Sequence, residues 1–154
     1  MSGLDPIKLS YIAGYFDGDG SVNACIFKTG RHAGEIRVEM NISSRVREPI
    51  ETIHNWLGFG YLEVKRRSKP IYVFRVNTQE DMLRFINLIL PYSITRRRQL
   101  ELMKEYLESR LRRGRELISY ERNGRVYRIP QRPPYSEREI QLIKEIQRLN
   151  REGE

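Results

Sequence analysis

Apolar residues recur along the chain at two spacings, and the changes between these spacings divide the sequence into helices and strands. Residues 6–17 predict a helix that begins at Asp5 and Pro6, because Asp accepts bonds from free N–H groups and Pro lacks one. Apolar and polar residues then alternate over 20–29 and 36–42, which predicts a long antiparallel hairpin with one dry and one wet face.

The same order of elements follows once more along the chain. Residues 48–57 predict a short helix that ends before Gly58, and alternating residues at 61–67 and 71–76 predict two further strands. A helix capped by Thr78 then runs to Leu90, and a longer helix follows over residues 95–113. The order is αββαββα, so we expect an α+β fold with a four-stranded antiparallel sheet.

The composition changes after Gly114. Residues 115–135 are rich in Pro and Arg and predict an extended arm, and residues 136–150 predict a last amphipathic helix with a capping box between Ser136 and Glu139. We therefore divide the chain into a core domain, residues 1–114, and a basic C-terminal arm and helix, residues 115–154.

The composition limits the classes of protein to which the chain could belong. The chain has 154 residues, 39% of them hydrophobic, which suits one domain with a buried core, and its formal net charge is +8. Most of the basic residues are Arg, which favours phosphate binding but also occurs in thermophilic or GC-rich genomes. The single Cys25 excludes an intrachain disulfide, and no membrane span or signal peptide is evident. We expect an intracellular protein, cytoplasmic or organellar, with no membrane partner.

Residues 12–20, IAGYFDGDG, place two acids and three glycines where the first helix ends. Gly14 and Gly18 lie four residues apart on one helix face, so a second backbone could approach there. The alternative is that this cluster only ends the helix and begins the strand. A calcium loop of EF-hand type does not fit, because Val22 and Lys28 stand where Gly and Glu are needed.

This stretch resembles the signature of the LAGLIDADG homing endonucleases, in their single-motif form. The element order, the run GFGYLEV at 58–64 and the run LPYSITRRRQ at 90–99 also match the family pattern, from about residue 9 to about 105. The resemblance implies a homodimer in which two motif helices pack face to face and two sheets form a saddle over double-stranded DNA. It also implies an intron-encoded, site-specific endonuclease that makes a double-strand break in a long, nearly palindromic target.

Metal-dependent phosphodiester hydrolysis needs hard cations, which prefer carboxylate and carbonyl oxygens. The resemblance implies that Asp19 and the Gly18 carbonyl hold Mg²⁺; Mn²⁺ is expected to substitute, and Ca²⁺ to bind without supporting cleavage. The two histidines, His32 and His54, offer no zinc cluster. The residues expected at the dimer interface are Tyr11, Ala13, Gly14, Asp17 and Gly18, and Asp17 suits either capping or interface hydrogen bonds.

Two further catalytic residues follow from the resemblance. Arg96 stands where the family usually has a Lys, and because Arg cannot act as a base its role would be electrostatic. Alternatively, residues 96–98 form a phosphate clamp at a helix N-terminus. Ser44 stands where relatives often carry a polar residue that contacts the nucleophilic water, although it could be an ordinary serine at a strand end.

Polar residues on the wet strand faces could reach base edges in the major groove, or could simply be solvated. The residues predicted to reach base edges are Asn23, Cys25, Phe27, Arg37, Glu39, Asn41, Glu63, Lys65, Arg67 and Arg75. Four further residues are predicted to contact the DNA backbone: Arg97 and Arg98 in the clamp, and Arg125 and Arg128 in the C-terminal arm, which could instead be a solvated tail. Cys25 and Phe27 would contact thymine methyl groups, unless the assignment of faces is shifted by one residue.

Two other functions use the same fold: an RNA maturase that assists intron splicing, and a non-cleaving DNA-binding regulator. The intact Asp19 argues against loss of cleavage, because a decayed nuclease has no need of it.

Overall fold

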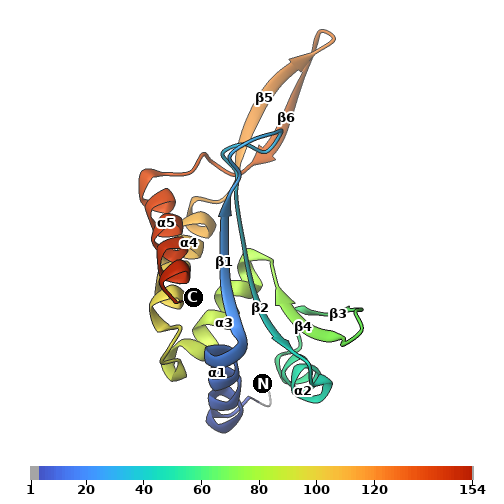
Figure 1. Cartoon of the computed structure of the whole chain (residues 1–154). Coiled ribbons are helices and arrows are strands. Elements are labelled where there is room, and N and C mark those ends of the chain that lie inside the picture. Colours follow the sequence, from blue (N-terminus) through green and yellow to red (C-terminus); the bar gives the residue numbers. More distant parts are fainter. Residues whose placement is uncertain (1–3, 154) are drawn as a thin grey trace.

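The computed structural model describes residues 4–153, with the backbone alone at positions 116 and 118. The helices and strands follow one another along the chain (Figure 1) as α1 (Pro6–Asp19), β1 (Gly20–Ile26), β2 (Ile36–Ser44), α2 (Arg47–Leu57), β3 (Tyr61–Lys65), β4 (Ile71–Val76), α3 (Gln79–Ile89), the 3-10 helix η1 (Leu90–Tyr92), α4 (Arg97–Arg113), β5 (Glu116–Arg122), β6 (Arg125–Gln131) and α5 (Glu137–Glu152).

Strands β1 to β4 form one antiparallel sheet in the order β1-β2-β4-β3. Gly20 pairs with Ile42, and Met40 pairs with Val76. In β1 and β2 the predicted alternation is confirmed, because their apolar residues face the helices while the residues between them face the other side of the sheet. The αββαββα order and the four-stranded antiparallel sheet are also confirmed.

The core lies between the sheet and the helices that cover one of its faces (Figure 1). Phe16 of α1 and Phe74 of β4 both meet the ring of Phe85 in α3 edge-on, with ring centroids 5.6 and 6.1 Å apart. All three rings are almost fully buried. Burial of each such side chain stabilises the fold by roughly 1.5–3 kcal/mol, so these contacts fix α1 and α3 on the sheet.

The predicted C-terminal arm is a β-hairpin. Strands β5 and β6 pair antiparallel, and the hairpin extends past the loop that joins β1 and β2 (Figure 1). Its turn residues Asn123 and Gly124 both have positive φ, 54° and 74°, which is typical of a two-residue hairpin turn. An Asn-Gly pair between alternating residues is the local sequence signal for such a turn.

Helix α5 shares the core of the preceding helices. Leu142, Ile143 and Ile146 are almost fully buried, and the predicted capping box at Ser136 is confirmed. Near the end of α5, the side-chain amide of Asn150 donates to the Val22 carbonyl at 2.8 Å, and that of Gln147 donates to the Ala24 carbonyl at 3.1 Å. Because β1 is an edge strand, these bonds satisfy backbone groups that no other strand pairs.

None of the helices within residues 4–153 combines the length and the apolar character that crossing a membrane requires.

Candidate functional site

The two acids at the end of α1 have different surroundings. The Asp17 carboxylate accepts hydrogen bonds from the Ser93 hydroxyl and from the backbone N–H groups of Ile94, Thr95 and Arg96. Burial raises the pKa of Asp17, but these hydrogen bonds outweigh burial and bring the pKa below its ordinary value. Asp17 therefore caps the loop before α4 from within its own chain, and its carboxylate is not available to a second subunit.

Asp19 is the last residue of α1 and is exposed. Its carboxylate has no hydrogen-bond or ion-pair partner within residues 4–153. The last carbonyls of a helix, here including that of Gly18, also lack donors within the helix, and the negative end of the helix dipole favours a cation. This end of α1 thus offers free oxygen ligands of the kind that hard cations prefer.

A single chain does not complete a metal site. Among the residues that the structure describes, no three His, Cys, Asp or Glu side chains gather closely enough to hold an ion. Asp19 and the Gly18 carbonyl provide the oxygen ligands that a divalent cation prefers, but they are too few to hold one. A further carboxylate would have to come from another molecule.

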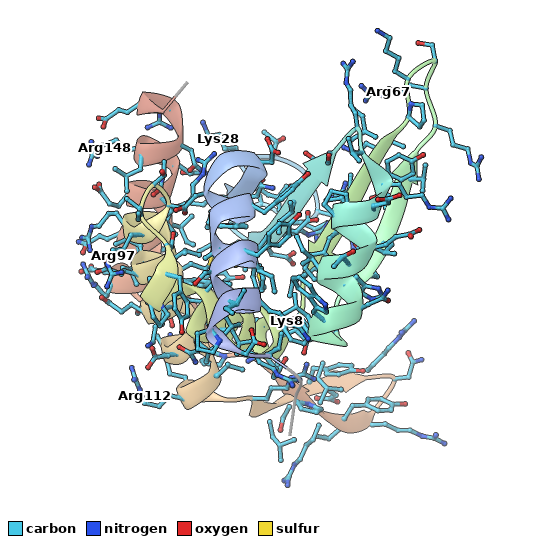
Figure 2. The ribbon with its side chains drawn as sticks, turned by 90° about the horizontal axis from the view of Figure 1, so that it is seen from below. Lys8, Lys28, Arg67, Arg97, Arg112 and Arg148 are labelled. Carbon is cyan, nitrogen blue, oxygen red and sulfur yellow. The ribbon has the colours of Figure 1, made fainter. Side chains whose placement is uncertain are left out.

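The three arginines before and within α4 point in different directions. The backbone N–H of Arg96 bonds to Asp17, and the Arg96 Nε is buried without a partner among the described residues. Arg97 donates to the Leu90 carbonyl at 3.0 Å and lies on the far side of α1 from β3 and β4 (Figure 2). Arg98 lies near Glu105 of α4 and Glu145 of α5; the pKa of Glu105 is lowered first by its hydrogen bond from Arg138 and, to a smaller extent, by the charge of Arg98. Arg97 is partly engaged by its own chain, but both arginines are exposed, so their role as DNA contacts stays a prediction.

Ser44 lies on the same side of β2 as Ile42, which faces the helices, and it pairs with Tyr72 of β4. Its hydroxyl accepts the N–H of Val46 at 3.0 Å and so stabilises the connection to α2. The preceding Ser43 has the opposite orientation and belongs to the open face. Ser44 is thus close to the end of the sheet that carries Asp19, but its hydroxyl is already engaged.

The open face of the sheet, which is the face turned away from the helices, brings together most of the residues predicted to bind DNA. The pairing registers place Asn23, Cys25, Arg37, Glu39, Asn41, Glu63, Lys65 and Arg75 on it. Cys25 pairs with Arg37, and the Arg37 guanidinium lies over the Phe27 ring at 4.9 Å, so the predicted assignment of faces is confirmed. Tyr61 pairs with Arg75 on this face and was missed, although it alternates with Glu63 and Lys65. Arg67 lies beyond β3 in an exposed turn (Figure 2).

Arg75 crosses the middle of the open face. Its guanidinium pairs with Glu39 of β2 and with Glu63 of β3, while its side chain is 16% exposed. The hydrogen bond that Arg75 donates to Glu39 is the largest cause that raises the pKa of Arg75, so the group stays charged. The two pairs hold the guanidinium in place and neutralise two acids that would otherwise repel a polyanion.

The outer face of α1 carries exposed Tyr11, Gly14 and Gly18, while Ala13 is fully buried in the chain's own core. The prediction that Ala13 lies at a subunit interface is therefore wrong. A Cβ added at Gly20 would lie 2.2 Å from Phe16, so the chain itself requires that glycine. A Cβ at Gly14 or Gly18 would meet no atom within 4 Å, so nothing in the described chain explains why these positions lack a side chain.

Two exposed apolar residues extend this outer face and were missed in the sequence. Ile7 begins the same stripe of α1, one helical turn before Tyr11, and is 81% exposed; Ile94, in the loop held by Asp17, is 85% exposed. Exposed apolar side chains beside glycines mark a surface suited to a close protein contact.

The residues of this site lie within the part of the chain that is similar to known proteins. The sequence profile of the family described as LAGLIDADG endonuclease matches residues 12–108, which is more than half of the chain. The protein belongs to the LAGLIDADG endonuclease family. The fold is similar to that of the homing endonuclease I-CvuI, solved in complex with the I-CreI target, at 24% identity and a TM-score of 0.58 over 66% of each chain.

The LAGLIDADG fold of this chain is also similar to two other solved structures. One is the archaeal intron-encoded homing endonuclease I-Vdi141I in complex with DNA, at 22% identity and a TM-score of 0.57, over 69% of this chain and 70% of that one. The other is the meganuclease I-AabMI bound to uncleaved DNA, at 17% identity and a TM-score of 0.55, over 65% of this chain and 36% of that one. No curated protein sequence gives a significant match.

Proposed function

We propose that the protein is a site-specific DNA endonuclease that acts as a homodimer and makes a double-strand break in a long, nearly palindromic target. The observation that carries the proposal is the free Asp19 carboxylate at the end of the family's motif helix. It stands directly before Gly20, which begins the sheet whose open face carries side chains suited to reading bases.

The open face is suited to base readout in the major groove. Arg37 and Arg75 can donate to guanine, and Asn23 and Asn41 can pair with adenine. Their support is rigid, because Ser21 donates to Asn41 at 3.1 Å and Arg75 is held from both sides. A net charge of +8 on each chain adds the sequence-independent attraction to phosphates.

Two copies of the chain would complete the cleavage site. Contact through Gly14 and Gly18 would bring the two Asp19 carboxylates to a common axis, where they and the Gly18 carbonyls would hold Mg²⁺. When bound, such an ion activates water and stabilises the leaving oxygen. Asp17 fixes the backbone of Arg96 beside this end of α1, so the Arg96 guanidinium can stabilise charge on the phosphate.

The test begins with the duplex that wild-type protein selects from a randomised pool. Asp19→Asn should bind this duplex in Ca²⁺ as tightly as the wild type, because the substitution keeps the size of the side chain. Its cleavage in Mg²⁺ should fall by several orders of magnitude, because the charge that holds the cation is lost. Glu108→Gln, which removes an exposed acid of α4, should cut normally. If Asp19→Asn cleaved at the wild-type rate, Asp19 would not be a metal ligand. If the wild-type protein left its selected duplexes intact, the proposed nuclease activity would be wrong.

A further inference from the structure

The β5–β6 hairpin has a surface that the rest of the chain does not use. Every residue of β6 is exposed, and so is every β5 residue whose side chain is described. Leu117 and Val126 are each 68% exposed. A two-stranded hairpin without a packing layer is at best marginally stable in water, so a hairpin of this kind is expected to gain order from a partner.

One face of the hairpin carries aromatic and cationic groups in sequence. The rings of Tyr120 and Tyr127 stack across the strands with centroids 5.3 Å apart at an interplanar angle of 20°. One step closer to the turn on this face, Arg122 pairs with Arg125. Arg128 extends from the opposite face, where it pairs with Ser119.

The pairing of Arg122 with Arg125 is unfavourable within the protein alone. Like charges directly opposite each other on an antiparallel pair destabilise it, and neither side chain has an acidic partner among the described residues. An anion placed between two guanidinium groups would reverse this cost, and a phosphate accepts such a pair well. The tip of the hairpin thus has the chemistry of a phosphate contact.

The position of the hairpin indicates which phosphates it could reach. Asp19 immediately precedes β1, and the loop that ends β1 lies seven residues further on, about 23 Å away at ~3.3 Å per residue. The hairpin projects beyond that loop (Figure 1). It therefore lies at the end of the sheet opposite to Asp19, outside the DNA that the sheet could cover.

We propose that the β5–β6 hairpin binds the phosphate backbone of duplex DNA that flanks the sequence read by the four-stranded sheet. Arg122 and Arg125 contact phosphates at the tip, and the stacked Tyr120 and Tyr127 lie against the sugar-phosphate backbone. The hairpin thus adds affinity without adding sequence specificity. This inference rests on the proposed DNA substrate, but it requires no cleavage.

The experiment measures binding in Ca²⁺ to the selected site in a 60-base-pair duplex and in a duplex trimmed to the site itself. Arg122→Gln with Arg125→Gln should weaken binding to the long duplex at least tenfold and leave the trimmed duplex unaffected. On the long duplex, the slope of log affinity against log salt should become shallower by about 3.6, because the two hairpins of the dimer lose four phosphate contacts. Because the substitution removes a like-charge pair, misfolding of the hairpin does not explain such a loss.

The matched control is Lys144→Gln with Arg151→Gln, which removes two exposed positive charges from α5. This variant should bind both duplexes with the wild-type salt slope. The proposal would be overturned if the hairpin variant lost equal binding affinity for the long and the trimmed duplex, or if its salt slope were unchanged. It would also be overturned if the variant lost affinity only for RNA. If selection from the randomised pool recovers no preferred duplex, the proposed site-specific cleavage is wrong. The hairpin proposal is then still tested by comparing the salt slopes of wild type and hairpin variant on a 60-base-pair duplex of random sequence.

Discussion

The Asp17 carboxylate accepts a hydrogen bond from the hydroxyl of Ser93, which lies 76 positions further along the chain. Three consecutive backbone N–H groups after Ser93 complete the set of donors. The carboxylate therefore ties the motif helix to the start of α4. Of the two acids in the motif, this one has a structural role, and Asp19 remains free for chemistry.

Asp17→Asn should lower the free energy of unfolding by about 1–3 kcal/mol at neutral pH, because the amide cannot accept from all four donors and leaves some of them unsatisfied. The folded-state pKa of Asp17 lies below its ordinary 3.8, so its contribution is present above that value and is lost as the pH falls through the folded pKa. Urea unfolding of wild type and variant should therefore differ at pH 7 and converge as the pH falls below the folded-state pKa of Asp17, which lies under 3.8.

Asp19→Asn is the matched control for this prediction, because Asp19 has no partner within the described chain. Its free energy of unfolding should equal that of the wild type within about 0.5 kcal/mol. Equal destabilisation by the two substitutions would show that the assignment of roles is wrong.

Gly14 allows a prediction in which stability and assembly change in opposite directions. Nothing in the described chain lies near a Cβ at this position, so Gly14→Ala should stabilise the isolated fold by about 0.5–1 kcal/mol through helix propensity. A close partner would meet the added methyl group, so dimerisation should weaken. Gly14→Leu should yield monomers in sedimentation velocity at micromolar concentration.

Asn55→Leu adds a similar side chain to the exposed face of α2 and should leave assembly unchanged. A wild-type protein that sediments as a monomer at the same concentration would contradict the proposed homodimer.

Glu139 is fully buried at the start of α5, where it accepts hydrogen bonds from Ser109 at 2.6 Å, Arg113 at 2.6 Å and Arg110 at 3.2 Å. Burial raises its pKa, but its partners, first among them Ser109, bring the pKa below the ordinary value. Glu139→Gln should reduce the free energy of unfolding by about 3–5 kcal/mol, because it leaves buried arginine charge uncompensated.

Thermal or urea unfolding checks this value, with Glu145→Gln as the control. Glu145 pairs with Arg148 at the surface, where water and salt screen the ion pair, so its loss should change the stability little. A small effect of Glu139→Gln would mean that α5 is held by its apolar face alone.

The strand faces and helix caps could be predicted from the sequence because both depend on neighbours only a few residues apart. A period of two assigns each strand residue to a face, so Asn23, Arg37 and Arg75 were placed together correctly. Thr78 and Ser136 cap helices through bonds to residues three positions away. The same local rule, applied to Asn123 and Gly124, would also have predicted the hairpin turn.

The roles of the residues in the motif helix could not be predicted in this way. Asp17 and Asp19 are two residues apart and so point about 160° apart around the helix, but their order in the sequence does not say which side meets another part of the chain. The loop after η1 decides this by donating its N–H groups to Asp17. Packing against the core likewise turns Ala13 inward and leaves Gly14 outward.

The sequence alone determined the family pattern, the order of elements and the polar face of the sheet, because these follow from short-range periodicity and from the motif. Only the tertiary structure decided which acid is free and which arginines bond to groups of their own chain. It alone also showed at which glycines the described chain has room for a side chain. Each of these depends on contacts between segments that are distant in the chain, and a helix or strand examined alone does not contain the partner that settles the role of its side chains.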